Sequence, residues 1–112
     1  MGRNALGELE HLILVAVLRL DEAAYGAAVI EEIEAHTGRD VSHAASYIAL
    51  QRLERKGMLE GRTEEETAGR GGRARRFFTV TEGGMGRLRE SASALFGIWQ
   101  DVDPTLRKKV GV

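Results

Sequence analysis

A glycine- and arginine-rich segment at residues 70–76 separates two stretches that have the composition of β-strands. It reads Arg-Gly-Gly-Arg-Ala-Arg-Arg and holds no acidic residue. The run after it, Phe77–Thr81, follows the two-residue period of a strand, which turns Phe78 and Val80 toward a core. We therefore predict a hairpin with strands at residues 58–67 and 73–81, joined by a positively charged loop around residues 68–72.

A short helix is predicted directly before this hairpin. Ser42 is a suitable N-cap and Gly57 a suitable C-terminal stop, and the last turn ends in the basic pair Arg55 and Lys56. A helical projection separates two faces. The inward face holds Leu50 and Leu53 with Ser46 and Ala49 beside them, and the outward face holds Ala44, Ile48, Arg52 and Arg55, flanked by Gln51.

The outward face of this helix has the chemistry of a surface that enters a DNA groove. An apolar side chain such as Ile48 can meet a thymine methyl group, and Arg or Gln can bond base edges. The alternative is an ordinary solvated face with one exposed aliphatic residue. A helix followed by a basic hairpin is the arrangement with which winged-helix proteins hold DNA.

The basic loop also has alternatives. It could be a solubilising loop, or a short arginine-glycine element of the kind that binds RNA. Three carboxylates on the first predicted strand, Glu64, Glu65 and Glu66, would repel phosphate, but they could pair with the arginines when DNA is absent.

Charge is divided unevenly along the 112 residues, whose net charge is −1. Residues 1–51 hold 3 basic and 8 acidic groups, residues 52–90 hold 10 and 7, and residues 91–112 hold 3 and 2, which gives −5, +3 and +1. A ligand senses mainly the local face, because salt screens charges beyond about 10 Å. The acidic first half therefore does not exclude nucleic acid as a partner.

Several classes of protein are disfavoured by what the chain lacks. Cysteine is absent, which excludes disulfides and thiolate metal sites and favours a reducing compartment, the cytoplasm. The apolar run Leu12–Leu18 is too short to cross a bilayer, and no signal peptide is evident, so we expect no membrane association. The histidines, His11, His36 and His43, are dispersed, and no Walker-type loop occurs. We expect no cofactor, no metal and no enzymatic activity.

The first two helices are predicted near residues 9–20 and 24–37. The first is apolar almost all round, because Leu14, Val15 and Leu18 are apolar in addition to the residues at helical core spacing. A helix of this kind has to be covered on more than one side, so we assign Leu14 and Leu18 to a dimer contact. The second helix buries Val29 and Ile33, exposes its glutamates and stops at Gly38.

The last predicted helix starts at Glu82, behind a Thr81 cap, and carries a heptad seam. The seam residues are Met85, Leu88, Ala92, Leu95, Trp99 and Val102. A seam with no partner left in so small a domain indicates pairing with a second subunit. The expected domains are a winged helix-turn-helix DNA-binding domain at 1–81, a dimerisation helix at 82–103 and a mobile tail at 104–112.

Over residues 5–102 the chain resembles PadR-type transcriptional regulators of the short kind, which have a single C-terminal helix. The resemblance is carried by Gly7–Leu14, Tyr25-Gly26, Ser42–Tyr47, the run Leu-Gln-Arg-Leu-Glu-Arg-Lys-Gly at 50–57, and residues 71–83. It implies a winged helix-turn-helix homodimer, mainly α-helical with a small β-hairpin, that represses transcription and is released from operator DNA by a small molecule or stress signal.

The candidate site residues follow from the residue patterns together with this resemblance. The candidate DNA contacts on the helix are Ser42, His43, Ala44, Tyr47, Ile48, Gln51, Arg52 and Arg55, and those on the wing are Arg70, Arg73, Arg75 and Arg76. Tyr47 matches the family's helix tyrosine, whose hydroxyl could reach a phosphate; a packed aromatic between helices is the alternative.

In some relatives a tryptophan of the last helix lines a pore that stacks flat aromatic ligands. The resemblance thus implies that Trp99, with Phe96, could line an effector pocket for a small aromatic or hydrophobic molecule. The alternative is that Trp99 only packs in a core. An alternative function for the whole chain is a winged-helix protein-interaction module that does not bind DNA, in which the arginines only confer solubility.

Overall fold

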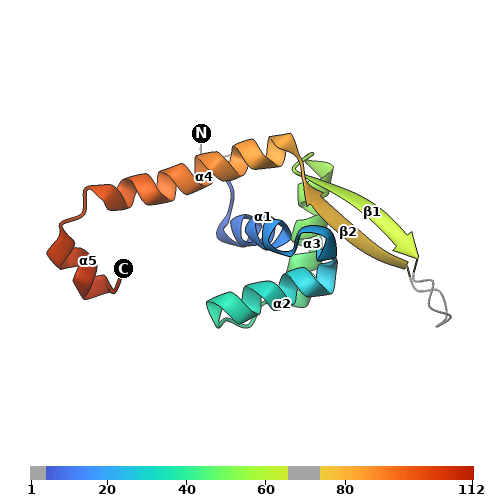
Figure 1. The fold of residues 1–112 in the computed structure, drawn as a ribbon, viewed down its shortest axis with the longest axis horizontal. Coiled ribbons are helices and arrows are strands. Elements are labelled where there is room, and N and C mark those ends of the chain that lie inside the picture. Colours follow the sequence, from blue (N-terminus) through green and yellow to red (C-terminus); the bar gives the residue numbers. More distant parts are fainter. Residues whose placement is uncertain (1–4, 66–73) are drawn as a thin grey trace.

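The computed structural model describes residues 5–65 and 74–112. It contains mainly helices and one antiparallel hairpin (Figure 1). The elements are α1 (Glu8–Leu20), the short 3-10 helix η2 (Asp21–Ala23), α2 (Gly26–Thr37), α3 (His43–Arg55), β1 (Leu59–Glu65), β2 (Ala74–Val80), α4 (Glu82–Gln100) and α5 (Pro104–Val110). This is the fold class predicted from the sequence.

The core forms around α1, which packs against α2, α3, β2 and α4. Ile13, Leu14, Ala16 and Val17 of α1 are buried there. Leu14 has 0% of its surface exposed, so it presents nothing to a second molecule. Its assignment to a dimer contact is corrected. In a helix that is apolar on most sides, periodicity does not show which apolar residues the chain itself covers.

The third helix forms as predicted. The Ser42 hydroxyl accepts a hydrogen bond from the Ala45 amide at 3.1 Å, which caps the N-terminus. After Lys56 the chain turns at Gly57, whose φ of 79° favours glycine. Ser46, Ala49, Leu50 and Leu53 are buried against the core, so the opposite face is directed outward.

The hairpin, here called the wing, pairs Leu59 with Val80 at its base and Glu65 with Ala74 at its far end. Phe78 and Val80 are buried, as the two-residue period predicts. The predicted loop around residues 68–72 lies outside the described residues, and so do Arg70 and Arg73.

The fourth helix begins behind Thr81, whose hydroxyl accepts a hydrogen bond from the Gly84 amide at 3.0 Å. The first turn packs so closely on the connection between α3 and β1 that a Cβ added to Gly84 would lie 2.2 Å from the Met58 carbonyl oxygen. The second half of α4 extends away from the body as an arm (Figure 1). None of the helices in residues 5–65 and 74–112 is long and apolar enough to cross a membrane.

Residues 104–112, which the sequence predicts to be a tail, instead contain α5. Asp103 caps this helix by accepting a hydrogen bond from the Thr105 amide at 2.7 Å, and Pro104 occupies its first position. The predicted end of α4 at Asp103 and Pro104 is therefore also the start of another helix. An Asp-Pro pair is both a stop signal for the preceding helix and a start signal for a following one.

Candidate nucleic-acid interface

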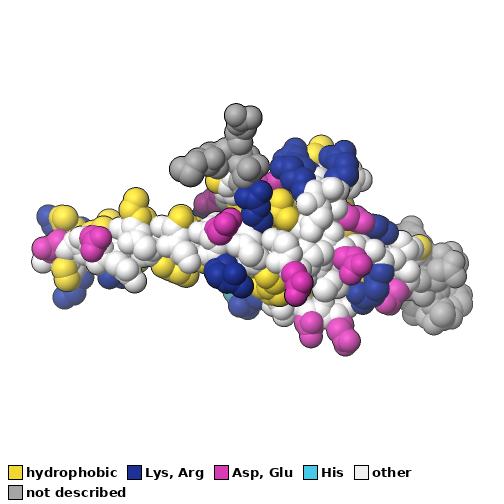
Figure 2. Space-filling model, turned by 90° about the horizontal axis from the view of Figure 1, so that it is seen from above, with side chains coloured by type: hydrophobic (Ala, Val, Ile, Leu, Met, Phe, Trp, Pro, Cys, Tyr) yellow, Lys and Arg dark blue, Asp and Glu magenta, His cyan; other side chains and the backbone are white. Residues whose placement is uncertain are grey.

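An exposed stripe runs along the outer side of α3. Ile48 has 54% of its surface exposed, which is unusual for an isoleucine. The other exposed members are Ser42, His43, Ala44, Gln51, Arg52 and Arg55. In Figure 2, Lys and Arg side chains gather on both sides of a hydrophobic side chain at the upper edge of the molecule, level with α3. The stripe combines apolar, amide and cationic groups that fit the edges of bases and phosphates.

Two residues of α3 also contact neighbouring helices. A guanidinium nitrogen of Arg52 lies 4.0 Å from a carboxylate oxygen of Glu10 on α1, at the limit of an ion pair. Tyr47 is half-exposed, and its ring lies against Gly26 at the start of α2, where an added Cβ would come within 2.5 Å of it. Tyr47 therefore has a packing contact while its edge remains accessible.

The wing presents two chemically different faces. On the face toward α3, the Arg76 guanidinium bonds the Glu54 carboxylate, and it also donates to the Thr63 hydroxyl at 3.0 Å. The sequence had suggested Glu64, Glu65 and Glu66 as partners for the arginines. Glu64 instead pairs with Arg62 of its own strand, at 2.7 Å, while Glu66 and the side chain of Glu65 lie outside the described part of the chain.

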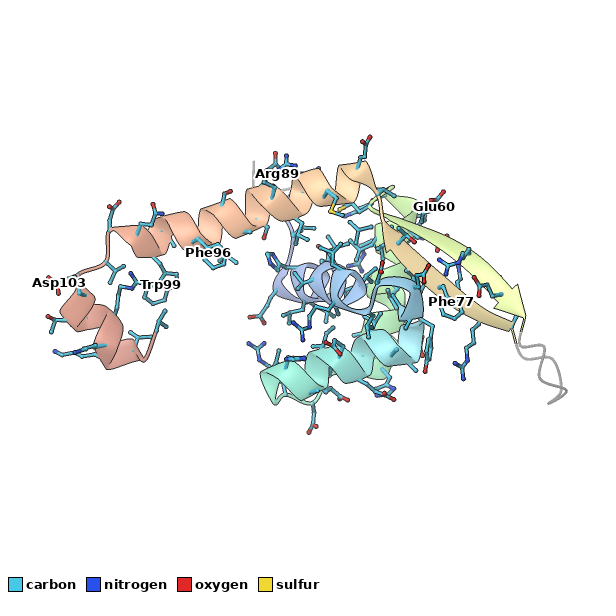
Figure 3. All side chains as sticks on the ribbon, in the orientation of Figure 1. Glu60, Phe77, Arg89, Phe96, Trp99 and Asp103 are labelled. Atoms are coloured by element: carbon cyan, nitrogen blue, oxygen red, sulfur yellow. The ribbon has the colours of Figure 1, made fainter. Side chains whose placement is uncertain are left out.

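On the opposite face, aromatic and cationic groups form a layer. The Arg75 guanidinium lies 4.4 Å from the centre of the Tyr25 ring, and Arg62 lies 5.2 Å from that of Phe77. The Tyr25 and Phe77 rings meet edge to face, with centres 5.7 Å apart. Figure 3 shows Phe77 directed from β2 toward the start of α2. Sequence reasoning missed Tyr25 and Glu54 as partners of the wing arginines, because only the strand register relative to the helices brings them together.

The arm formed by α4 exposes a strongly apolar surface. Leu95, Phe96 and Ile98 have 55%, 71% and 75% of their surfaces exposed. Figure 2 shows hydrophobic side chains along both edges of this arm. The predicted seam is divided: Met85 and Leu95 are exposed, Ala92, Trp99 and Val102 are half-buried, and Leu88 belongs to the core of its own chain. The prediction that Leu88 is a dimer contact is therefore corrected, because Leu88 is a core residue. Leu18 of α1, also predicted to be a dimer contact, is exposed.

A groove of about 760 Å³ lies between the start of α1 and the middle of α4. Apolar lining comes from Leu6, Leu12 and Leu95, and a hydrogen bond of 2.6 Å between His11 Nδ1 and the Ser91 hydroxyl joins the two helices beside it. The groove is continuous with the exposed apolar surface of the arm through Leu95.

The sequence matches the model of the PadR-like transcriptional regulator family over residues 14–90, which includes α2, α3, the wing and the first turns of α4. The chain belongs to this family. Members are transcriptional regulators that act on DNA and not enzymes.

Solved structures support the fold of this PadR-family chain. A PadR-like regulator from Bacillus cereus is 23% identical, with a TM-score of 0.67, and the match covers 93% of this chain and 92% of that one. A PadR-family regulator from Eggerthella lenta is 26% identical, with a TM-score of 0.60 and coverage of 90% and 82%. BpsR of Bordetella bronchiseptica, whose DNA binding is regulated by 6-hydroxynicotinic acid, is 15% identical, with a TM-score of 0.60 and coverage of 94% and 74%. No curated protein matches the sequence.

Two carboxylates of this PadR-family chain form ion pairs with arginines that lower their pKa values. A hydrogen bond and the charge of Arg39 lower the pKa of Glu8 below its ordinary value, and the same pairing raises the pKa of Arg39. A hydrogen bond from Arg19 lowers the pKa of Glu32, although desolvation of Glu32 opposes it. Neither carboxylate belongs to the outer stripe of α3. Within residues 5–65 and 74–112, no group of His, Cys, Asp and Glu side chains could hold a metal ion.

The predicted effector residues of this PadR-family chain lie on the arm. Figure 3 shows Phe96 and Trp99 directed to the same side of α4, with Trp99 near α5. Phe96 is largely exposed and Trp99 is half-buried. The two aromatic rings are thus placed on one surface of a single chain, outside its compact core.

Proposed function

We propose that this protein is a homodimeric repressor that binds operator DNA through α3 and the wing and is released by a small hydrophobic or aromatic effector. The observation that carries the DNA-binding role is the exposed stripe on α3, in which Ile48 stands among cationic and amide groups. In this proposal α3 enters the major groove. Ile48 meets thymine methyl groups, and Gln51 and Arg52 read base edges.

Contacts to the backbone complete the interface. Ser42 and His43 at the N-terminus of α3 and Arg55 at its end are exposed and lie before and after the reading residues along the chain. The wing adds Arg70, Arg73 and Arg75 beyond the helix. Contacts of this kind position the protein on the duplex and supply affinity that does not depend on sequence.

The exposed apolar side of α4 supports the homodimer. Leu95, Phe96 and Ile98 would be costly to leave in water on a projecting helix, and a second copy of the arm offers a matching surface. A dimer places two α3 helices on successive turns of one side of the duplex, and a dimer bound at a promoter blocks polymerase.

The aromatic pair on the arm supports release by an effector. A flat ligand stacked between Phe96 and Trp99 of two subunits would change how the arms meet, and with it the separation of the two α3 helices. We place this activity in the cytoplasm, in line with the absence of cysteine from the sequence.

Footprinting of the purified protein across its own gene neighbourhood tests this function. We expect a protected near-palindrome, with binding that weakens steeply with salt at a log-log slope of about −0.9 per neutralised phosphate. Absence of binding to any duplex at low salt would contradict the proposal and favour a protein-interaction module.

A further inference from the structure

The guanidinium of Arg76 joins three elements of the chain. Its Nε donates a hydrogen bond of 3.3 Å to one carboxylate oxygen of Glu54, its Nη2 donates to the other oxygen, and its Nη1 donates to the Thr63 hydroxyl at 3.0 Å. Glu54 belongs to α3, Thr63 to β1 and Arg76 to β2. One side chain therefore connects the proposed reading helix to both strands of the wing.

Gly61 provides the space for this arrangement. A Cβ added at Gly61 would lie 2.7 to 2.8 Å from three atoms of the Arg76 guanidinium. The absence of a side chain at this position lets the guanidinium lie against β1, between Thr63 and α3. The Arg76 and Glu54 side chains keep 46% and 29% of their surfaces exposed, so the link lies at the surface beside the proposed DNA interface.

Two roles compete for Arg76. The sequence predicts a phosphate contact, as for Arg75, but the pleat of β2 places the two side chains on opposite faces of the wing, and Arg75 stacks on Tyr25. All three guanidinium nitrogens of Arg76 already donate to protein oxygens. These bonds use three of the five guanidinium N–H groups and hold the side chain against Glu54 and Thr63, which leaves one N–H on each Nη for any further acceptor.

We propose that Glu54, Arg76 and Thr63 form a strut that fixes the wing at its angle to α3. This inference rests on the proposed DNA-binding function and assigns Arg76 a positioning role within it. An interface whose two parts are held before binding loses less conformational freedom when it meets DNA. The strut therefore contributes to DNA affinity without touching the duplex.

The two roles predict opposite changes in DNA affinity for the neutral variant of Glu54. A carboxylate beside a DNA interface repels phosphate, so without a strut Glu54→Gln tightens binding. With the strut, the same substitution weakens binding several-fold, because the amide no longer holds both guanidinium nitrogens by charge-assisted bonds. Arg76→Lys is equally informative. It keeps the positive charge for a phosphate but loses the two-pronged geometry that Glu54 requires.

The experiment measures binding of the full-length protein by fluorescence anisotropy, across a salt series. The probes are a duplex recovered by in vitro selection and a random-sequence duplex of equal length. The variants are Glu54→Gln, Arg76→Lys and their combination. Glu64→Gln is the matched control, because Glu64 also pairs with an arginine of the wing but through its own strand. Circular dichroism and thermal unfolding check that each variant is folded.

A second readout needs no DNA. The chain has no cysteine, so Ala45→Cys on α3 and Ala74→Cys at the end of the wing give two exposed labelling positions. Electron-electron distances between nitroxides at these positions are measured in the wild-type background and in each variant. Dilution with unlabelled protein leaves one labelled chain in any dimer.

If the strut exists, Glu54→Gln and Arg76→Lys each weaken binding to the selected and the random duplex by similar factors. The double variant binds no more weakly than either single variant, and the salt slope of binding stays unchanged. The distribution of nitroxide distances between positions 45 and 74 is then also broader in each single variant than in the wild type. The strut is overturned if Glu54→Gln binds DNA more tightly, Arg76→Lys binds almost normally and the nitroxide distances are unchanged. Arg76 is then a phosphate contact. If the wild type binds no duplex, the proposed function fails, and the distance distributions alone support or overturn the strut.

Discussion

Gln51 and Arg75 belong to different parts of the proposed interface, and their loss should have different signatures. Gln51 belongs to the exposed stripe of α3, where an amide can bond a base edge. We expect Gln51→Ala to lower affinity for the selected duplex by about 1 to 3 kcal/mol. Affinity for random DNA should hardly change, as anisotropy titrations of the two duplexes will show. Equal losses on both would make Gln51 a backbone contact.

Arg75 is expected to act on the phosphate backbone. Arg75→Ala should weaken binding to the selected and random duplexes alike and should flatten the log-log salt slope by about 1. The measurement is the same titration repeated from low to moderate salt. Because Arg75 also stacks on Tyr25, Arg75→Lys serves as the control that retains the charge. An unchanged slope in Arg75→Ala would exclude a phosphate contact at this position.

The ion pair between Glu8 and Arg39 gives a pH-dependent prediction. Arg39 lowers the pKa of Glu8 in the folded chain, so the pair stabilises the fold above the ordinary glutamate pKa of 4.5, and this contribution is lost as pH falls through the lowered value. The Tm of Arg39→Gln should therefore lie slightly below that of the wild type at pH 7, with the gap closing in acid. Thermal unfolding between pH 7 and pH 3 measures it.

Arg89→Gln, at an exposed arginine of α4, is the control for the general effect of removing a positive charge. A Tm difference for Arg39→Gln that stays constant into strong acid would mean that the pairing with Glu8 contributes nothing. Both side chains of the pair are largely exposed, so added salt should shrink the effect at pH 7.

The elements that form the candidate interface were predictable because their signals are local. The Ser42 cap, the Gly57 stop and the helical spacing of Ser46, Ala49, Leu50 and Leu53 defined both the limits and the buried face of α3. Alternation likewise placed Phe78 and Val80 inside the wing. In each case the signal lies within a few residues of the structure that it specifies.

Features that depend on packing between elements were not predictable. The bond of Arg76 to Glu54 spans 22 residues and depends on how the wing lies against α3. Helix α5 was missed for a different reason: Asp103 and Pro104 can end one helix and start the next, and composition does not separate these roles. The burial of Leu14 was not predictable, because apolar residues cover most sides of α1 and periodicity alone does not select the buried ones.

Two glycines at the start of α4 give a matched test of packing between elements. Gly84 faces the Met58 carbonyl oxygen, whereas an added Cβ at Gly86 would meet nothing within 4 Å. Gly84→Ala should destabilise the fold by about 1 to 3 kcal/mol, because backbone would have to move. Gly86→Ala should stabilise it by up to about 1 kcal/mol through helix propensity. Urea unfolding measures both, and stabilisation by Gly84→Ala would contradict the close contact.

At the scale of the whole molecule, the arm is the part that one chain leaves uncovered. The body surrounds α1 with α2, α3, the wing and the start of α4, but the second half of α4 projects beyond it (Figure 1). The exposed apolar arm continues through Leu95 into the groove beside α1. A single chain is therefore well packed around α3 and the base of the wing, whereas the apolar side chains of its arm are exposed at the opposite end.

A charge on the arm should separate the subunits of the proposed dimer and so weaken its binding to the operator. Leu95→Glu places a carboxylate on the apolar surface that the proposed dimer buries, and desolvation of this charge opposes assembly. Ser93→Glu is the control, because residue 93 is exposed and two positions away on the helix, about 200° round its axis. Sedimentation equilibrium should find Leu95→Glu monomeric at micromolar concentration and Ser93→Glu dimeric.

Binding to a palindromic operator then tests whether the two subunits act together. A monomer reaches only one half-site at a time, so Leu95→Glu should lose most of the affinity for the full palindrome while its affinity for an isolated half-site stays close to that of the wild type. Because the second half of α4 projects away from α3 and the wing (Figure 1), direct damage to the proposed reading surface is not expected. A monomeric Leu95→Glu that still bound the palindrome as tightly as the wild type would show that operator affinity does not depend on the arm.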